Sequence, residues 1–232
     1  MTRWLWRAFL ALLAFVAICA ELDRASVARP QLAILVPGPF RSFAQSSVAL
    51  LALTTGDSAT AQSEARRLVR RRPMPAEHLF TLAMAEMRAA RPAAFAADFR
   101  AASTRGWRFA PLQVTAAQAA LASGDVSGAA NRVAALWAAD AEDPSTVALT
   151  KALLAAPGGP EAFAVPLAQT RVWSGNFLAS AAALGSAQVI ARTVQSAQAR
   201  GAHFDCDAVE RLSGQLAGPA PGKSRETVAC RP

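Results

Sequence analysis

Apolar residues recur along the middle of the chain, from Ser42 to Asp140, at the three- and four-residue spacing of amphipathic helices. Small or apolar side chains also return every 34 residues in this region. These sets are Ala49, Ala83 and Ala117; Ala61, Phe95 and Ala129; Ala65, Phe99 and Val133; and Leu68, Ala102 and Leu136. The last three sets share one helix face, since each follows the previous one by three or four residues. The pattern predicts helix pairs that repeat along the chain.

Turn signals separate the two helices of each predicted pair. Gly56–Asp57 and Gly124–Asp125 lie 68 residues apart, twice the repeat length, and Ala90–Arg91 lies midway between them. The Gly-Asp pair is read as the turn between two helices. Pro73 then stops the second helix of the first pair. We therefore predict equivalent bends around residues 56, 90 and 124.

With its 34-residue helix pairs, small contact residues, Gly-Asp turns and closing Pro73, the chain resembles the tetratricopeptide repeat (TPR) family. The resemblance implies an all-α, TPR-like helical-hairpin solenoid over residues 42–165. The family's bulky positions differ here. The usual Trp position holds Gln45, Leu79 and Gln113, and the usual Tyr position holds Ala52, Glu86 and Ala120. A non-repeating helical bundle is the alternative fold.

The resemblance also implies a concave groove formed by the first helix of each pair. The residues expected to face this groove are Phe43, Leu50, Leu53, Phe80, Met84, Met87, Arg88, Val114 and Gln118. Exposed Met and Phe side chains would suit an amphipathic or extended peptide. Core packing is the alternative role for each of these residues.

Composition agrees with a helical fold and limits the classes of partner to be expected. The chain is 53% hydrophobic but only 7% aromatic, with no Tyr, so strand formers are scarce. Its net charge of +8 comes largely from Arg, but no aromatic residues alternate with the basic ones, so we expect no nucleic-acid partner. The densest basic cluster contains Arg66, Arg67, Arg70, Arg71 and Arg72. It is interpreted either as the solvated end of a helix or as a surface for acidic glycan or anionic lipid.

The first twenty residues have the layout of an export signal. Arg3 and Arg7 precede an uncharged apolar stretch that lasts until Glu21. We predict a signal peptide or membrane anchor over residues 1–20, with cleavage and retention both open, and a Pro-containing connector over residues 21–41. The following residues are expected outside the cytoplasm, in the periplasm, either anchored in the inner membrane by residues 4–20 or released after cleavage.

The C-terminal part, residues 166–232, is predicted to be a helical cap that ends in a hairpin. The segment from Cys206 to Ala217 is expected to form one helix, and a second short helix would bring Cys230 back beside Cys206. A disulfide between these two cysteines is the preferred interpretation in an oxidising compartment. Two reduced thiols, or a zinc site that adds His203, are the alternatives.

Reactive side chains do not form a recognisable catalytic motif. The two histidines, His78 and His203, belong to no zinc or nucleophile signature, and Pro157–Pro160 lacks the Gly-Lys-Ser/Thr ending of a phosphate loop. We expect no enzymatic activity, no cofactor and no metal. The chain is predicted to be a non-enzymatic protein-interaction scaffold in the bacterial envelope, as an accessory to an assembly or polysaccharide-export system. Its partner would be a protein or peptide, with the membrane contacted through the N-terminal segment.

Overall fold

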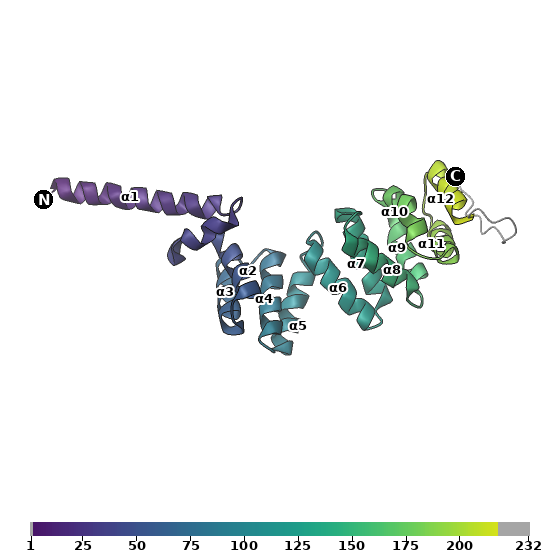
Figure 1. Cartoon of the computed structure of the whole chain (residues 1–232), viewed down its shortest axis with the longest axis horizontal. Coiled ribbons are helices and arrows are strands. Elements are labelled where there is room, and N and C mark those ends of the chain that lie inside the picture. The colour runs from purple at the N-terminus through teal and green to yellow at the C-terminus, as the bar shows by residue number, and fades with distance from the viewer. Residues whose placement is uncertain (1, 218–232) are drawn as a thin grey trace. The chain divides into compact units, whose positions relative to one another are not determined.

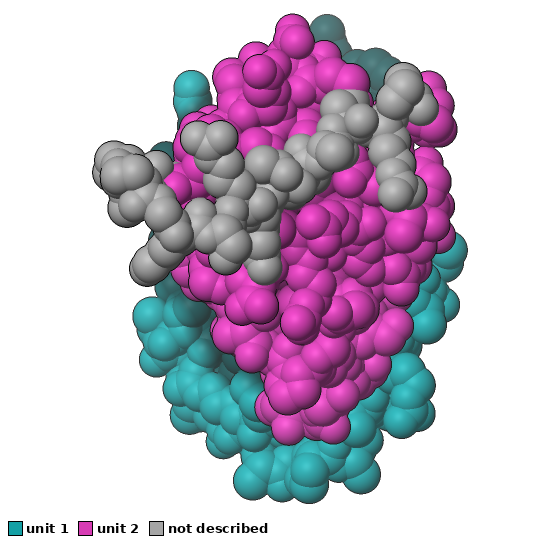
Figure 2. Space-filling model, turned by 90° about the vertical axis from the view of Figure 1, so that its right-hand side faces the viewer, with its two compact units in different colours: residues 1–106 teal, residues 107–232 magenta. Residues whose placement is uncertain are grey.

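A computed structural model describes residues 2–217 of the chain, and all regular secondary structure in this range is helical. The predicted all-α class is therefore confirmed. The chain divides into two compact units, residues 1–106 and residues 107–232, which are coloured separately in Figure 2. Each unit is described by itself below.

Unit 1 begins with a long apolar helix and continues with two helix pairs (Figure 1). Its elements are α1 (Thr2–Ala25), the 3-10 helices η1 (Pro30–Leu35) and η2 (Gly38–Phe40), and α2 (Ala44–Thr55), α3 (Ser58–Arg71), α4 (Ala76–Arg88) and α5 (Pro92–Ser103). Within this unit α2 packs against α3, α4 packs against α5, and α4 also contacts both α2 and α3. The second pair is therefore stacked on the first.

Unit 2 contains one further pair of the same kind and a larger helical assembly. Its elements are α6 (Ala110–Ala122), α7 (Val126–Ala139), α8 (Pro144–Ala155), α9 (Gly159–Gln169), α10 (Ser174–Ser180), η3 (Ala181–Ala183), α11 (Ala187–Ala199) and α12 (Cys206–Ala217). Helix α8 contacts both α6 and α7, as α4 contacts α2 and α3 in unit 1. The predicted helix from Cys206 to Ala217 is confirmed. Cys230 and the helix expected before it lie outside the described residues, so the disulfide stays a prediction.

The predicted 34-residue period is visible in the helix starts. Helices α3, α5 and α7 begin at Ser58, Pro92 and Val126. The predicted small contact residues Ala49, Ala83 and Ala117 are all fully buried. At the remaining contact positions Phe95 and Phe99 are half-buried, and the others are buried. The bends and the buried helix faces thus follow the pattern expected from the sequence.

The three bends are alike in place but not in detail. Ala90 and Gly124 both adopt a left-handed conformation, with φ of 54° and 76°. The next residues close the same helix-ending motif, since the Arg91 amide donates to the Glu86 carbonyl at 2.9 Å and the Asp125 amide to the Ala120 carbonyl at 2.8 Å. The bend at Gly56 is one residue tighter, and there a Cβ atom would lie only 2.7 Å from the Ala52 carbonyl oxygen.

Aspartate side chains cap the helices that follow these turns. Asp57 accepts a hydrogen bond from the Thr60 amide at 2.8 Å, and Asp125 accepts one from the Gly128 amide at 2.8 Å. Asp143 does the same for α8 through the Ser145 amide at 2.7 Å. Each carboxylate satisfies a backbone N–H that has no partner within its own helix.

Helix α1 continues beyond the predicted boundary at Ala20 and ends at Ala25. It is long and apolar enough over Arg3–Ala25 to cross a membrane, judged by length and composition. The short ribbon after α1 lies beside its C-terminal end (Figure 1), where α1 contacts both η1 and η2. The segment predicted as a plain connector is therefore folded against the apolar helix.

Candidate functional site

The predicted groove residues of α4 form a stripe along that helix. Phe80, Met84 and Met87 are spaced four and three residues apart, which places them on one helix face. The Phe80 ring lies 6.3 Å from the Phe99 ring of α5, so Phe80 also contributes to packing within its pair. Met84 is half-buried, whereas Met87 is 53% exposed. We call Phe80, Met84 and Met87 the α4 stripe.

Leu53 and Arg88, two further predicted groove residues, lie where α2 and α4 end. The Arg88 guanidinium donates to the Leu53 carbonyl oxygen, and also to the Gly56 carbonyl oxygen at 2.6 Å. These two bonds hold the C-terminal ends of α2 and α4 together. Leu53 is half-buried and packs against the small cluster Ala61, Ala65, Leu82 and Ala85. Arg88, expected to face a partner, thus uses its side chain to link two helices of unit 1.

Two other predicted groove residues of unit 1 lie elsewhere. Leu50 lines an apolar cavity of about 480 Å³ between η1 and α2. The cavity is lined by Pro30, Gln31, Ala33, Ile34, Ser47, Val48, Leu50, Leu51 and Thr54. Phe43 precedes α2, and the Arg72 guanidinium lies over its ring at 4.5 Å from the centroid. The structure therefore does not gather Phe43 and Leu50 with the α4 stripe.

Val114 and Gln118 belong to α6 in unit 2. Val114 is half-buried and packs against the core of that unit, while Gln118 is exposed. Within unit 2, neither of them lines a described cavity.

The predicted anionic surface is largely engaged in contacts within the chain. Arg66 pairs with Glu86 at 2.9 Å, and Arg67 pairs with Glu64 at 2.7 Å. Arg71 donates to the Arg41 carbonyl oxygen and, at 2.6 Å, to the Gly38 carbonyl oxygen. Arg72 covers Phe43. Among the described residues, only Arg70 of this cluster lacks an intramolecular partner.

A buried carboxylate joins the first pair to the second. Glu86 has a side chain only 3% exposed, and its oxygens accept from Arg66 at 2.9 Å and from the Gln62 amide at 2.6 Å. Arg91 Nη1 lies 3.5 Å from Oε2, the oxygen that also accepts from the Gln62 side chain. Burial raises the pKa of the nearby Asp98 carboxyl; Glu86 raises it further, and Arg66 lowers it. The TPR resemblance predicts a Tyr at the position of Glu86; here the side chain makes ion pairs with Arg66 and Arg91.

The sequence interpretation missed the role of Asp23. This buried residue of α1 accepts hydrogen bonds from the amides of Ser42, Phe43 and Ala44 at 2.8, 3.1 and 2.9 Å. It therefore caps the N-terminus of α2 from a different helix and fixes the direction in which α1 leaves the first pair. No local spacing signals a cap nineteen or more residues away.

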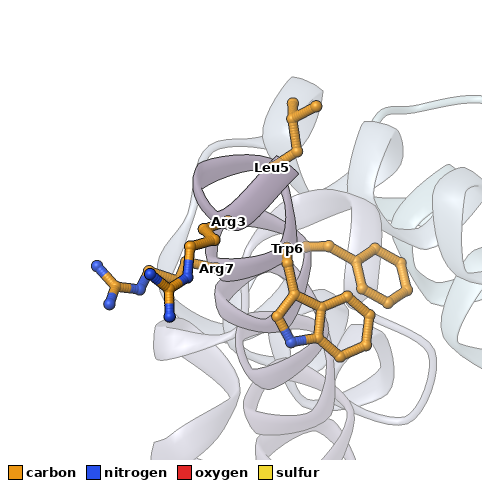
Figure 3. A pocket seen from close by; sticks show the side chains of 5 residues that line it. Arg3, Leu5, Trp6 and Arg7 are labelled. Atoms are coloured by element: carbon orange, nitrogen blue, oxygen red, sulfur yellow. The ribbon is translucent and has the colours of Figure 1, made fainter. Parts of the chain in front are cut away.

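The N-terminal end of α1 carries a shallow concavity lined by Arg3, Leu5, Trp6, Arg7 and Phe9. Arg3 and Arg7 project to one side of the helix, and Trp6 lies on another side (Figure 3). The Trp6 and Phe9 rings are stacked with centroids 5.8 Å apart. Basic and aromatic residues in this arrangement suit the boundary between lipid and water better than a ligand site.

Chemically reactive groups are dispersed over the described part of the chain. Within residues 2–217 no three His, Cys, Asp or Glu side chains are grouped so that they could hold a metal ion. His78 begins α4 and contacts the Arg72 carbonyl oxygen through Nδ1 at 2.9 Å, a structural role. His203 borders a cavity of about 400 Å³ together with Arg171 and Asp205. Asp205 there caps α12 through the Ala208 amide at 2.9 Å.

No protein-family model matches the chain, and the searches of curated proteins and of solved structures also give no match.

Proposed function

We propose that this chain is a membrane-anchored, TPR-like protein that binds a segment of another protein outside the cytoplasm. The repeat assignment is supported by the helix starts at Ser58, Pro92 and Val126 and by the buried alanines at matching positions. Stacked helix pairs bury their faces against neighbouring pairs, which leaves the first helices available for recognition.

The observation that carries the binding role is the α4 stripe. Met87 is 53% exposed, and Met84 and Phe80 continue the same helix face into the fold. Methionine adapts its shape to irregular apolar surfaces, and an apolar helical face suits an amphipathic or extended segment. The partner's contribution would be apolar residues at helical or alternating spacing.

The proposal keeps α1 as a permanent anchor. Cys19 is buried, α1 contacts both η1 and η2, and Asp23 caps α2, so the end of the apolar helix is part of the fold of unit 1. Arg3 would remain on the cytoplasmic side, and Arg7, about one turn further along α1, would extend its guanidinium to the same boundary. An intact mass of the membrane-purified chain that includes residues 1–20 is the expected result, and a mass that begins after Ala20 would contradict retention.

Direct binding of acidic glycan or anionic lipid by Arg66, Arg67, Arg70, Arg71 and Arg72 is the weaker candidate. Four of these side chains already satisfy carboxylates, carbonyls or a ring in unit 1. A contribution to envelope assembly or polysaccharide export follows only from the family resemblance, and it too is a hypothesis.

The test compares Met84→Asp and Met87→Asp with Met74→Asp. Met74 is a matched control because it is 72% exposed in unit 1 and lies between α3 and α4, away from the stripe. Proteins cross-linked in intact membranes and captured with the tagged chain would be quantified for each variant. We expect the stripe variants to lose captured partners by at least about thirty-fold, the size of a central contact worth about 2 kcal/mol.

The control variant should retain the partners. Circular dichroism of all three variants checks that the helices remain. Equal capture by the wild type and the two stripe variants would contradict recognition through the α4 stripe.

A further inference from the structure

The feature that carries a new inference is the folded segment after α1. It presents an apolar surface made by Ile34 and Leu35 of η1 and by Leu50 and Leu51 of α2, which we call the connector surface. Ile34 is 62% exposed and Leu35 is 61% exposed. The apolar cavity of about 480 Å³ opens between these two elements. Contiguous exposed apolar surfaces of this kind mark sites of interaction with a protein, a ligand or a membrane.

The length of α1 defines how deep this surface would lie. A bilayer core of about 30 Å needs roughly 20 helical residues. Counted from Trp4, such a span reaches Asp23, close to the exposed ion pair between Glu21 and Arg24 at 3.3 Å. This pair therefore marks the outer boundary of the lipid.

The segment after α1 reaches back below that boundary. The Phe40 ring of η2 lies edge-on to the Phe15 ring of α1, with centroids 5.8 Å apart. Phe15 precedes Glu21 by six residues, which corresponds to about 9 Å along a helix that rises about 1.5 Å per residue. If α1 spans the bilayer, η2 and its neighbours must then occupy the outer part of the lipid.

The chemistry of the segment suits that position. Residues 30–40, PQLAILVPGPF, contain no charged side chain, and Arg29 and Arg41 flank them. Pro30, Pro37 and Pro39 have no N–H group to satisfy, which lowers the cost of placing irregular backbone near lipid. Flanking arginines at this depth can meet lipid phosphates.

The hydrogen bonds of Asp23 fix the arrangement. Its carboxylate is buried and accepts three amide hydrogen bonds from residues 42–44, so it is shielded from the lipid and ties α1 rigidly to α2. The connector surface therefore cannot swing away from the membrane without breaking this cap.

We propose that the connector surface is seated in the outer leaflet, where the acyl chains of membrane phospholipids cover Ile34, Leu35, Leu50 and Leu51. This rests on the proposed retention of α1. An apolar face buried about 5–10 Å into the interface is typical of helices that lie in the membrane plane. Unit 1 would thus hold the α4 stripe at a fixed height above the lipid.

The test uses the full chain reconstituted into vesicles of phosphatidylethanolamine and phosphatidylglycerol. A small fraction of the phosphatidylglycerol carries a photoreactive diazirine on its acyl chain, and the adducts are mapped by mass spectrometry. We expect adducts on α1 and also on residues 30–51. A variant with Ile34→Asp and Leu35→Asp should lose the adducts of residues 30–51 and keep those of α1. Met74→Asp should change neither set.

The outcomes separate this inference from the proposed function. Adducts confined to α1 would overturn the seating of the connector surface while leaving the anchor intact. A chain that has lost residues 1–20 would overturn both the anchor and the seating. A third outcome is the expected set of lipid adducts together with unchanged partner capture by Met87→Asp. It would overturn recognition through the α4 stripe and leave the seating supported.

Discussion

Units 1 and 2 share the same kind of helix pair but differ in what fills their interiors. In unit 1 the buried apolar residues form small separate clusters, Ala61, Ala65, Leu82 and Ala85 in one and Ala33, Val36 and Ala44 in the other. Polar links such as Glu86 with Arg66 and Gln62 join its two pairs. In unit 2 a single cluster extends from α6 to α12.

Several aromatic rings pack against one another within that larger cluster. Phe163 lies 5.3 Å from Phe177, and Trp137 lies 5.7 Å from Phe177, measured between ring centroids. The same helix-pair design can thus be held by close contact between small residues and ion pairs, or by large buried rings. We expect unit 2 to resist unfolding more strongly, since buried apolar area is the main source of stability.

The largest expected effect comes from Phe163→Ala. Its ring is fully buried, and removing a buried Phe costs about 3–5 kcal/mol. Urea unfolding followed by tryptophan fluorescence is a selective readout, because none of the five tryptophans, at positions 4, 6, 107, 137 and 173, lies within residues 21–106. Phe99→Ala, at a half-buried position of unit 1, should cost about 1–2 kcal/mol. Amide hydrogen exchange of α4 and α5 would measure this loss, because the fluorescence does not report on these helices. Equal losses from both changes would contradict the difference between the interiors.

The next effect concerns the ionic link of unit 1. Glu86→Gln should lower the local stability of unit 1 by about 1–3 kcal/mol, because Arg66 and Gln62 lose a charged acceptor in a buried place. Amide hydrogen exchange of α3 and α4 would measure it. Glu77→Gln, at an exposed position of the same helix, should change stability by less than about 0.5 kcal/mol. Unchanged exchange in Glu86→Gln would show that the link contributes nothing to joining the pairs.

A smaller pair of effects tests whether the bends of the two units are equivalent. Ala90→Gly should stabilise unit 1 by about 1 kcal/mol, because an alanine is strained at φ of 54°. Gly124→Ala should destabilise unit 2 by a similar amount; a Cβ there meets no atom within 4 Å, so only backbone strain changes. Urea midpoints of the two variants should move in opposite directions. A shift in the same direction would show that the bends differ in strain.

The smallest effect is a pH dependence within unit 1. Burial raises the pKa of Asp98, so the folded chain binds this proton more tightly than the unfolded chain. The ionised carboxyl therefore destabilises the fold at neutral pH, and the penalty disappears as pH falls through the raised pKa. Asp98→Asn should make unit 1 slightly more stable at neutral pH and equal to the wild type in acid.

Asp57 should change the stability of unit 1 with pH in the opposite direction. The amide and hydroxyl of Thr60 donate to its carboxylate and lower its pKa. Its contribution is present above the unfolded pKa and is lost as pH falls through the lowered one. At neutral pH the wild type should therefore be more stable than Asp57→Asn. In acid the two proteins should have the same stability. Hydrogen exchange as a function of pH in both variants would check the signs; a stabilising Asp57→Asn would contradict this assignment.

Much of the helical framework could be predicted from local signals. The period of 34 residues, the bends at residues 56, 90 and 124 and the caps at Asp57 and Asp125 depend on residues close together in the chain. The candidate site was less predictable. Met84 and Met87 share the expected face, whereas Leu50 lines a cavity against η1 and Arg88 holds the end of α2. Which partner a long or apolar side chain meets depends on elements that no local pattern specifies.

The sequence by itself determined that this chain forms helices, where the bends between the paired helices lie, and which small residues lie between those helices. These features follow from the helix propensity of each residue and from the helical spacing of apolar residues, which both depend on neighbours in the chain. Only the tertiary structure decided that Asp23 caps α2, that residues 30–40 fold back onto α1, and that most of the arginine cluster is used within unit 1. Those contacts join positions far apart in the chain, and their free energy exists only once the helices are packed.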